Sequence, residues 1–246
     1  MCIKLNALII LKLTLNLVIV IVFVILLSHN ALAGVIIGGT RVVVNEKNNS
    51  ATFSVRNKDK IPYLVSTKIG FATPWDSSQE IEKQQVPFIT TPPLFVLGEG
   101  KENTIRVIYT GGNLPSDRES LFQLEIASIP SGKSKDNELQ VAVRTRLKLI
   151  WRPKALEDDS GQAYTKLHWN KRGVETEVTN PTPYVVTIFN LKVNGSASIN
   201  SGVVMPFTTK IIHLCPERGT CKLEYQSISD YGRIMPAHQY FVLPHR

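Results

Sequence analysis

Residues 139–152 read Leu-Gln-Val-Ala-Val-Arg-Thr-Arg-Leu-Lys-Leu-Ile-Trp-Arg, and their alternation is the strongest structural signal in the chain. Apolar side chains hold one parity, with Thr145 as the single break, and most side chains of the other parity are polar or cationic. Because successive side chains of a strand point to opposite faces, this pattern predicts one long strand with an apolar and a cationic face. Such a strand would span roughly 45 Å, longer than most strands in globular proteins. We therefore expect it to overhang its own sheet and to offer the overhang to another chain.

The first 33 residues differ from the rest of the chain. Lys4 and Lys12 flank apolar stretches, residues 17–27 are wholly apolar, and Ala31-Leu32-Ala33 supplies small residues directly afterwards. This pattern predicts a secretory signal peptide over residues 1–33, removed after export. A retained membrane anchor is the alternative, since the apolar stretch approaches the length needed to span a bilayer.

The net charge limits the kinds of partner that the protein can bind, and the cysteine content indicates how its cysteines are used. No Asp or Glu precedes residue 34, so losing Lys4 and Lys12 takes the formal net charge from +8 to +6. A moderate basic excess suits an anionic lipid, a nucleic acid or a carboxylate, and an exported protein meets little nucleic acid. Cys215 and Cys221 remain as an even pair in an oxidising compartment, which favours a disulfide over a metal site, because only His213 lies near them.

The remaining sequence predicts an all-β protein. Short alternating runs recur about every ten residues between turn signals, with almost no helical periodicity, as is typical of β-sandwiches. A polar, charged link near residues 153–162 separates two series of strands. We expect two immunoglobulin-like domains, over residues 34–155 and 156–246. The strands expected in the second domain are Tyr164–Trp169, Val174–Val178, Tyr184–Val193, Lys210–Leu214, Lys222–Ser227 and Gln239–Leu243.

Three motifs occur in a recognisable order. Residues 114–122 read Leu-Pro-Ser-Asp-Arg-Glu-Ser-Leu-Phe, residues 149–153 read Leu-Ile-Trp-Arg-Pro, and residues 180–184 read Asn-Pro-Thr-Pro-Tyr. With these motifs the chain resembles the periplasmic chaperones of the chaperone–usher pathway, which assemble bacterial pili and fimbriae. The short link before the long strand, and the absence of Cys from residues 34–214, resemble the short-link branch of the family.

The resemblance implies an architecture and a function. The family has two immunoglobulin-like domains set at an angle, with a cleft between them. Its members lend a strand to incomplete pilus subunits and deliver these subunits to an outer-membrane usher. The resemblance implies Leu139, Val141 and Val143 as the side chains that enter the subunit, and we expect Leu147, Leu149 and Trp151, on the same parity, to fill the chaperone's own core.

The resemblance also assigns two sets of charged residues. Arg41 and Lys148 match the cations that bind the C-terminal carboxylate of the subunit, a group that Arg can grip with two parallel hydrogen bonds. Glu119, Arg152 and Asp230 match a network of salt bridges between the domains. Without the resemblance, all five would be read as solvated surface charges.

Nothing in the sequence indicates an enzyme. It contains no nucleophile elbow, paired-His zinc motif or phosphate loop, and its His residues are scattered. We expect no cofactor, no metal, no small-molecule substrate and no nucleic-acid partner. The remaining alternative to a chaperone is a structural pilus or adhesin component built as an immunoglobulin-like module.

Overall fold

The computed structural model describes residues 15–18, 34–72, 86–132, 139–156, 160–172, 175–198, 202–216 and 219–242. The chain divides into two units, Met1–Gly34 and Val35–Arg246, and the second unit holds every described strand. Of the predicted signal peptide, only the helical residues 15–18 are described, and the rest lies outside the described part. Within the described residues, no helix is long and apolar enough to cross a membrane.

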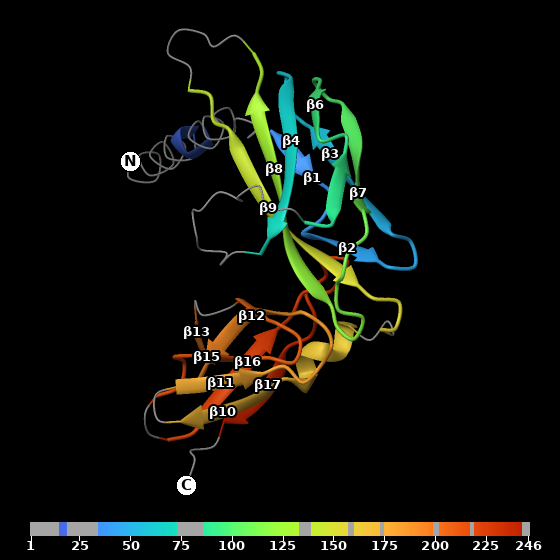
Figure 1. Cartoon of the computed structure of the whole chain (residues 1–246). Coiled ribbons are helices and arrows are strands. Elements are labelled where there is room, and N and C mark those ends of the chain that lie inside the picture. The colour runs from blue at the N-terminus through green and yellow to red at the C-terminus, as the bar shows by residue number, and fades with distance from the viewer. Residues whose placement is uncertain are drawn as a thin grey trace, which may run out of the picture. The chain divides into compact units, whose positions relative to one another are not determined.

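Two sheets form the first sandwich (Figure 1). One holds, in spatial order, β1 (Val35–Ile37), β3 (Ser50–Asn57), β7 (Glu102–Tyr109) and β5 (Phe88–Thr91). The other holds β2 (Arg41–Asn45), β9 (Val143–Arg152), β8 (Ser120–Pro130), β4 (Tyr63–Phe71) and β6 (Leu94–Leu97). Buried apolar side chains from both sheets make one core. This arrangement confirms the predicted sandwich.

The chain changes sheets between β1 and β2. β1 pairs antiparallel with β3, whereas β2 pairs parallel with β9 in the other sheet. Gly38 allows the crossing because a Cβ there would lie 2.6 Å from Ser54 Oγ, closer than real Cβ atoms approach. Gly39 follows at φ 136°, a conformation that favours glycine. The crossing delivers the next residues, from Arg41 on, to the edge of the sheet that contains β9.

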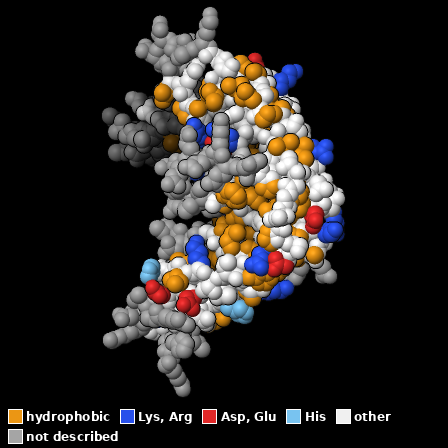
Figure 2. Space-filling model, viewed as in Figure 1, with side chains coloured by type: hydrophobic (Ala, Val, Ile, Leu, Met, Phe, Trp, Pro, Cys, Tyr) orange, Lys and Arg blue, Asp and Glu red, His pale blue; other side chains and the backbone are white. Residues whose placement is uncertain are grey.

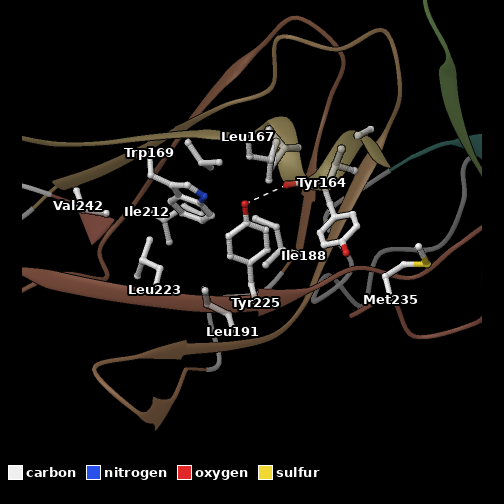
Figure 3. Close-up of a cluster of buried hydrophobic side chains, with 14 of the residues drawn as sticks. Tyr164, Leu167, Trp169, Ile188, Leu191, Ile212, Leu223, Tyr225, Met235 and Val242 are labelled. Carbon is white, nitrogen blue, oxygen red and sulfur yellow. Dashed lines mark hydrogen bonds between the residues drawn. The ribbon is translucent and has the colours of Figure 1, made fainter. Parts of the chain in front are cut away.

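The second sandwich has its own core. One sheet holds β10 (His168–Arg172), β11 (Glu175–Thr179) and β15 (Thr209–Ile212), and the other holds β13 (Ser196–Ala197), β12 (Val186–Val193), β16 (Cys221–Gln226) and β17 (His238–Val242), with β14 (Gly202–Val204) paired to β12. Figure 3 shows Trp169, Leu223 and Tyr225 among the buried side chains between them. The Tyr225 hydroxyl is buried and donates to the carbonyl oxygen of Tyr164 at 3.0 Å, which satisfies it inside an apolar core.

Two predicted strands differ from the structure. Residues 164–169 were expected to be extended, but a 3-10 helix, η1 (Ser160–Lys166), covers most of them and β10 begins at His168. The helix buries Ala163 and Tyr164, with Leu167 buried one turn later, so this apolar spacing belongs to a helical turn. Of the other predicted ends, Val174 and Leu243 lie outside the described residues. The short strands β13 and β14 are not among the strands predicted for the second domain.

The other difference concerns the long strand, which begins at Val143 rather than at Leu139. Its pairing with β8 ends with Ser128 opposite Val143, two residues before Pro130. Proline has no N–H to donate, so the ladder cannot continue through Pro130. Residues 139–142 therefore extend beyond the sheet as irregular backbone.

A buried asparagine organises the same corner in both sandwiches. Asn57 donates through Nδ2 to the carbonyl oxygens of Ile61 at 2.7 Å and Leu97 at 3.2 Å, and its Oδ1 accepts from the backbone N–H of Asp59. Asn180 repeats the device. Its Nδ2 donates to a carbonyl oxygen four residues on and to one on a distant strand, and its Oδ1 accepts from the N–H two residues on. The motif at residues 180–184 thus forms a corner built around a fully satisfied buried amide.

Candidate functional site

β9 is the element from which the candidate site is built. Its C-terminal half pairs with β8 on one side and with β2 on the other, from Lys148 opposite Arg41 to Arg152 opposite Asn45. β2 covers this side of β9 only from Lys148 onward. The backbone that precedes Lys148 is therefore where another strand could extend the line of β2 along β9.

The apolar side chains at alternate positions of β9, and of the residues just before it, form two groups, one buried and one exposed. Three side chains lie in the first core, and this confirms the expectation for them: Leu147, Leu149 and Trp151. The other three are open to solvent, with exposed fractions of 87% for Leu139, 59% for Val141 and 53% for Val143. Figure 2 shows broad hydrophobic areas on one face of the molecule, with Lys and Arg side chains scattered among them. A row of exposed aliphatic side chains at the end of a strand is a typical partner-binding feature.

Arg41 and Lys148 lie side by side, because they are register partners on the parallel strands β2 and β9. Arg41 is only 9% exposed, and its Nη1 donates to the carbonyl oxygen of Ile228 at 2.8 Å. Its buried Nε has no hydrogen-bond partner among the described residues. An unsatisfied guanidinium donor beside a second cation is a chemically suitable place for a carboxylate.

The pKa values show that positive charge is disfavoured at this place. Burial and, to a smaller extent, the neighbouring Arg41 together lower the pKa of Lys148 to about 8. Burial also lowers the pKa of Arg41, while Asp230 and Glu119 act in the opposite direction. A carboxylate bound between the two cations would stabilise both of their charged forms.

Arg152 joins the two predicted salt-bridge carboxylates. Its Nε donates to Glu119 Oε1 at 2.7 Å, and its Nη1 lies 2.8 Å from Asp230 Oδ2. Glu119 also accepts the backbone N–H of Val185 at 2.7 Å, and Ser160 Oγ donates to Asp230 Oδ2 at 3.0 Å. Burial raises the pKa of Glu119, against the opposing effect of Arg152. The cluster connects β9 and Glu119, the residue before β8, to three segments of the second sandwich, at Ser160, Val185 and Asp230.

Some of these contacts could not be found from sequence. The Val185 and Ile228 groups are backbone atoms, which carry no residue-type signal. A further contact between the sandwiches, Arg118 over the ring of Phe207 at 5.0 Å, joins a motif residue to a residue that no motif marks. Its exposed geometry makes this a modest cation–π interaction.

The predicted Cys215–Cys221 disulfide is present, with the two Cα atoms 5.6 Å apart. Both cysteines lie in the core of the second sandwich, so the bond is structural in position. Among the described residues, no group of three or more His, Cys, Asp and Glu side chains is placed to hold a metal ion.

Comparison with known proteins supplies the family. Residues 34–157 match the model described as "Pili and flagellar-assembly chaperone, PapD N-terminal domain", and residues 162–239 match "Pili assembly chaperone PapD, C-terminal domain". The chain belongs to the PapD family of pili-assembly chaperones. This membership confirms the predicted family and the two immunoglobulin-like domains, and it makes the chain a chaperone rather than an enzyme.

Relatives of this chaperone cover most of its length. It is 37% identical over 201 residues to the uncharacterized fimbrial chaperone YcbF of Escherichia coli K12, spanning 81% of this chain and 85% of that one. It is 34% identical over 216 residues to the chaperone protein FimC of the same strain, spanning 86% of each. The structure of the Salmonella enterica SafB chaperone with SafA pilin aligns with a TM-score of 0.75 and 29% identity, over 87% of this chain and 99% of that one.

Proposed function

We propose that this chaperone captures pilus subunits in the periplasm by lending them the segment from Leu139 to β9, and that it delivers them to an outer-membrane usher. The observation that carries the proposal is the exposed row of Leu139, Val141 and Val143, which leads directly into a strand anchored in the chaperone's own core. Each aliphatic side chain buried in a subunit groove contributes roughly 1.5–3 kcal/mol before the ordering of the segment is counted. Three such side chains can therefore hold a guest that lacks a strand.

Arg41 and Lys148 set the register of the guest in this proposal. Because β2 occupies β9 beyond Lys148, a guest strand whose C-terminal carboxylate reaches this pair must lie alongside the residues that precede Lys148. It then runs parallel to β9 and ends where β2 begins. A slip of one residue would turn its apolar side chains away from the chaperone, so a fixed carboxylate specifies the pairing.

Glu119, Arg152 and Asp230 fix the relation of the two domains in the proposal. The ion pairs span both predicted domains, 34–155 and 156–246, and two of their members are nearly inaccessible to solvent. The matches of the two family models to residues 34–157 and 162–239 support this division of the chain.

The proposal also includes export of the chain before it acts. Residues 1–33 act as a signal peptide that is cleaved, leaving a mature chain that begins near Gly34. A relative of known structure, SfaE, is described as a periplasmic chaperone, and it is 33% identical to this chain over 84% of its length with a TM-score of 0.69. Membership of a chaperone family removes the support for the alternative of a structural pilus component.

Co-expression with a pilus subunit tests the anchor. The double variant Arg41→Ala/Lys148→Ala should lose at least about tenfold of the co-purified subunit, since charge-assisted hydrogen bonds contribute about 1.5–3 kcal/mol each. The double variant Arg56→Ala/Arg106→Ala removes the same charge from exposed positions on β3 and β7 and should capture the subunit normally. Equal capture by both double variants would reject the anchor.

A further inference from the structure

The two residues that precede β8 contact two separate segments of the second sandwich. The backbone N–H of Glu119 donates to the carbonyl oxygen of Pro183 at 2.8 Å, and the Glu119 carboxylate accepts the N–H of Val185 at 2.7 Å. The guanidinium group of Arg118 lies 5.0 Å from the centroid of the Phe207 ring. The first sandwich is therefore attached to the second at a place that includes neither Arg41 nor Lys148.

One buried side chain, Asn180, holds these two segments of the second sandwich together. Its Nδ2 donates to the carbonyl oxygen of Tyr184 at 2.7 Å and to that of Val204 at 3.2 Å. Its backbone N–H donates to the carbonyl oxygen of Thr208 at 2.9 Å. The two segments thus form one unit, which we call the socket and which consists of residues 183–185 and 204–208.

Phe207 stands in the socket in a backbone conformation that bulky residues rarely adopt. Its φ is 55°, in the left-handed region, where a large side chain is strained. The loop around it is well fixed, because Thr208 Oγ1 donates to the carbonyl oxygen of Met205 at 2.9 Å and Pro206 is buried. The Phe207 ring is nevertheless 47% exposed, so burial in the core does not explain why it is there. Strain of this kind is common where a side chain serves a function.

The Arg118 guanidinium is held in a fixed orientation at the Phe207 ring. Its Nε donates to Asp117 Oδ1 at 3.0 Å and its Nη2 donates to Asp117 Oδ2 at 2.8 Å, a two-point pair that fixes the plane of the group. A second arginine of the first sandwich, Arg152, lies over the ring of Tyr184, with Cζ 5.6 Å from the centroid. Both distances are within the range of cation–π attraction, so the socket presents one ring to each arginine.

The placement of the second sandwich reaches the proposed guest anchor through Arg41. Nη1 of Arg41 donates to the carbonyl oxygen of Ile228, which belongs to the second sandwich, at 2.8 Å. The direction of the Arg41 guanidinium therefore depends on where the second sandwich lies. Contacts at the socket restrict that placement, although they do not touch Arg41.

We infer that Phe207 is a positioning residue for subunit capture. By holding Arg118 it fixes the second sandwich, and the Ile228 carbonyl then keeps Arg41 directed at the guest carboxylate. Phe207 acts through these residues rather than through contact with the guest. The inference rests on the proposed carboxylate anchor at Arg41 and Lys148, and it adds a residue that no sequence motif marks.

Peptide binding to the mature chaperone tests the inference. The probe is a synthetic copy of the C-terminal strand of a subunit that co-purifies with the natural chain, made with a free carboxylate and with a C-terminal amide. The natural chain should prefer the carboxylate by about tenfold or more. Phe207→Gly should reduce this preference by about two- to fivefold, the range of one exposed cation–π contact, and should bind the amide as the natural chain does. Glycine adopts a φ of 55° without strain, so the loop keeps its shape in this variant.

Further variants separate positioning from folding. Phe207→Tyr keeps the ring and should keep the full preference for the carboxylate. Phe241→Ala removes an exposed ring whose cation–π partner, Lys222, lies in the same sandwich, and it should leave the preference unchanged. Spin labels at Thr104→Cys and Gln239→Cys, on exposed positions of β7 and β17, should give a broader distance distribution with Phe207→Gly than in the natural sequence.

The outcomes distinguish this inference from the proposed function. If the natural chain binds both peptides equally, or neither, the carboxylate anchor is wrong and the inference falls with it. If the natural chain prefers the carboxylate and Phe207→Gly keeps that preference in full, the anchor stands and the positioning role is overturned. An equal loss in Phe241→Ala, or a reduced preference with an unchanged distance distribution, would also overturn it.

Discussion

At the scale of the residue, the environment of Lys148 bears most directly on the chemistry of the candidate site. The half-buried Lys148 lies beside the buried Arg41, and burial together with that neighbour brings the pKa of Lys148 to about 8. Lys148 was identified from the sequence through its match to a family motif. Its lowered pKa depends on the parallel pairing of β2 with β9, two segments about a hundred positions apart, which no local pattern reveals.

We predict that guest capture depends on pH through Lys148. Below pH 8 the ammonium group is charged and the affinity for a C-terminal carboxylate peptide should be nearly constant. Above pH 8 the affinity should fall by up to about tenfold per pH unit, because the unbound chaperone then releases the proton that binding requires. Dissociation constants measured from pH 6 to 9.5 test this, and Lys148→Arg, which stays charged, should remove the dependence. A Lys148→Arg variant that retains the full slope would assign the titration to another group.

The lowered pKa of Lys148 also determines whether its contribution to the free energy of unfolding rises or falls with pH. In the unfolded chain the ammonium titrates near its ordinary pKa of 10.5, so between pH 8 and 10.5 the unfolded state binds more protons than the folded state. The contribution of Lys148 to the free energy of unfolding therefore rises with pH in this window. Guest binding and unbound stability thus respond to pH in opposite directions, as expected of a residue whose charge serves a partner.

At the scale of the element, β9 shows what a sequence pattern can and cannot specify. The alternation correctly predicts which face is apolar and that Leu147, Leu149 and Trp151 fill the core. It cannot give the start of the strand, because that depends on the partner β8 and on Pro130, which ends the ladder. Alternation reports where side chains point, while pairing depends on a second segment.

The short strands illustrate the same limit. β1 and β2 are a few residues long and belong to different sheets, and the crossing depends on Gly38 packing closely against Ser54. The Asn180 corner was predictable as a turn because prolines surround it. The Asn57 corner uses the same hydrogen bonds, and residues 57–60 are turn-like in sequence, but that pattern does not show that the amide is buried.

We predict that the exposed and the buried apolar side chains of residues 139–151 respond differently to substitution. Val141→Glu should leave the free energy of unfolding unchanged, since this side chain is 59% exposed, and should weaken subunit capture by placing a charge in an apolar groove. Leu149→Ala, at a side chain with no exposed surface, should lower the free energy of unfolding by about 2–5 kcal/mol. Denaturant unfolding and subunit co-purification measure both quantities. Gln140→Glu, a neighbouring charge on the opposite parity, is the control and should capture the subunit better than Val141→Glu, whereas equal loss in the two would argue against insertion of Val141.

At the scale of the whole molecule, the Arg152 guanidinium connects the two sandwiches through buried ion pairs. Arg152 ends β9 and holds both Glu119, the residue before β8, and Asp230 of the second sandwich. The three residues lie more than a hundred positions apart at the extremes, so sequence alone proposed them only through the family resemblance. Their geometry adds a physical reason, since a carboxylate that is 2% exposed needs a partner to remain ionised.

We predict that Arg152→Ala lowers the stability of the mature chaperone by about 3–5 kcal/mol, because it strands the buried Glu119 carboxylate. Trp151 and Trp169 lie in the cores of the first and second sandwich, so chains in which Trp75 and one of these two are replaced report each domain separately by fluorescence during urea unfolding. In the natural chain the two reporters should change together, and in Arg152→Ala they should separate, with the Trp151 transition moving to lower urea. Glu119→Gln added to Arg152→Ala should restore part of the loss by removing the stranded charge, while Arg56→Ala, which breaks an exposed pair with Glu102, should change stability by less than about 1 kcal/mol. Coincident transitions in Arg152→Ala, at the midpoint of the natural chain, would show that the domains are held together by their other contacts and that the ion cluster does not couple them.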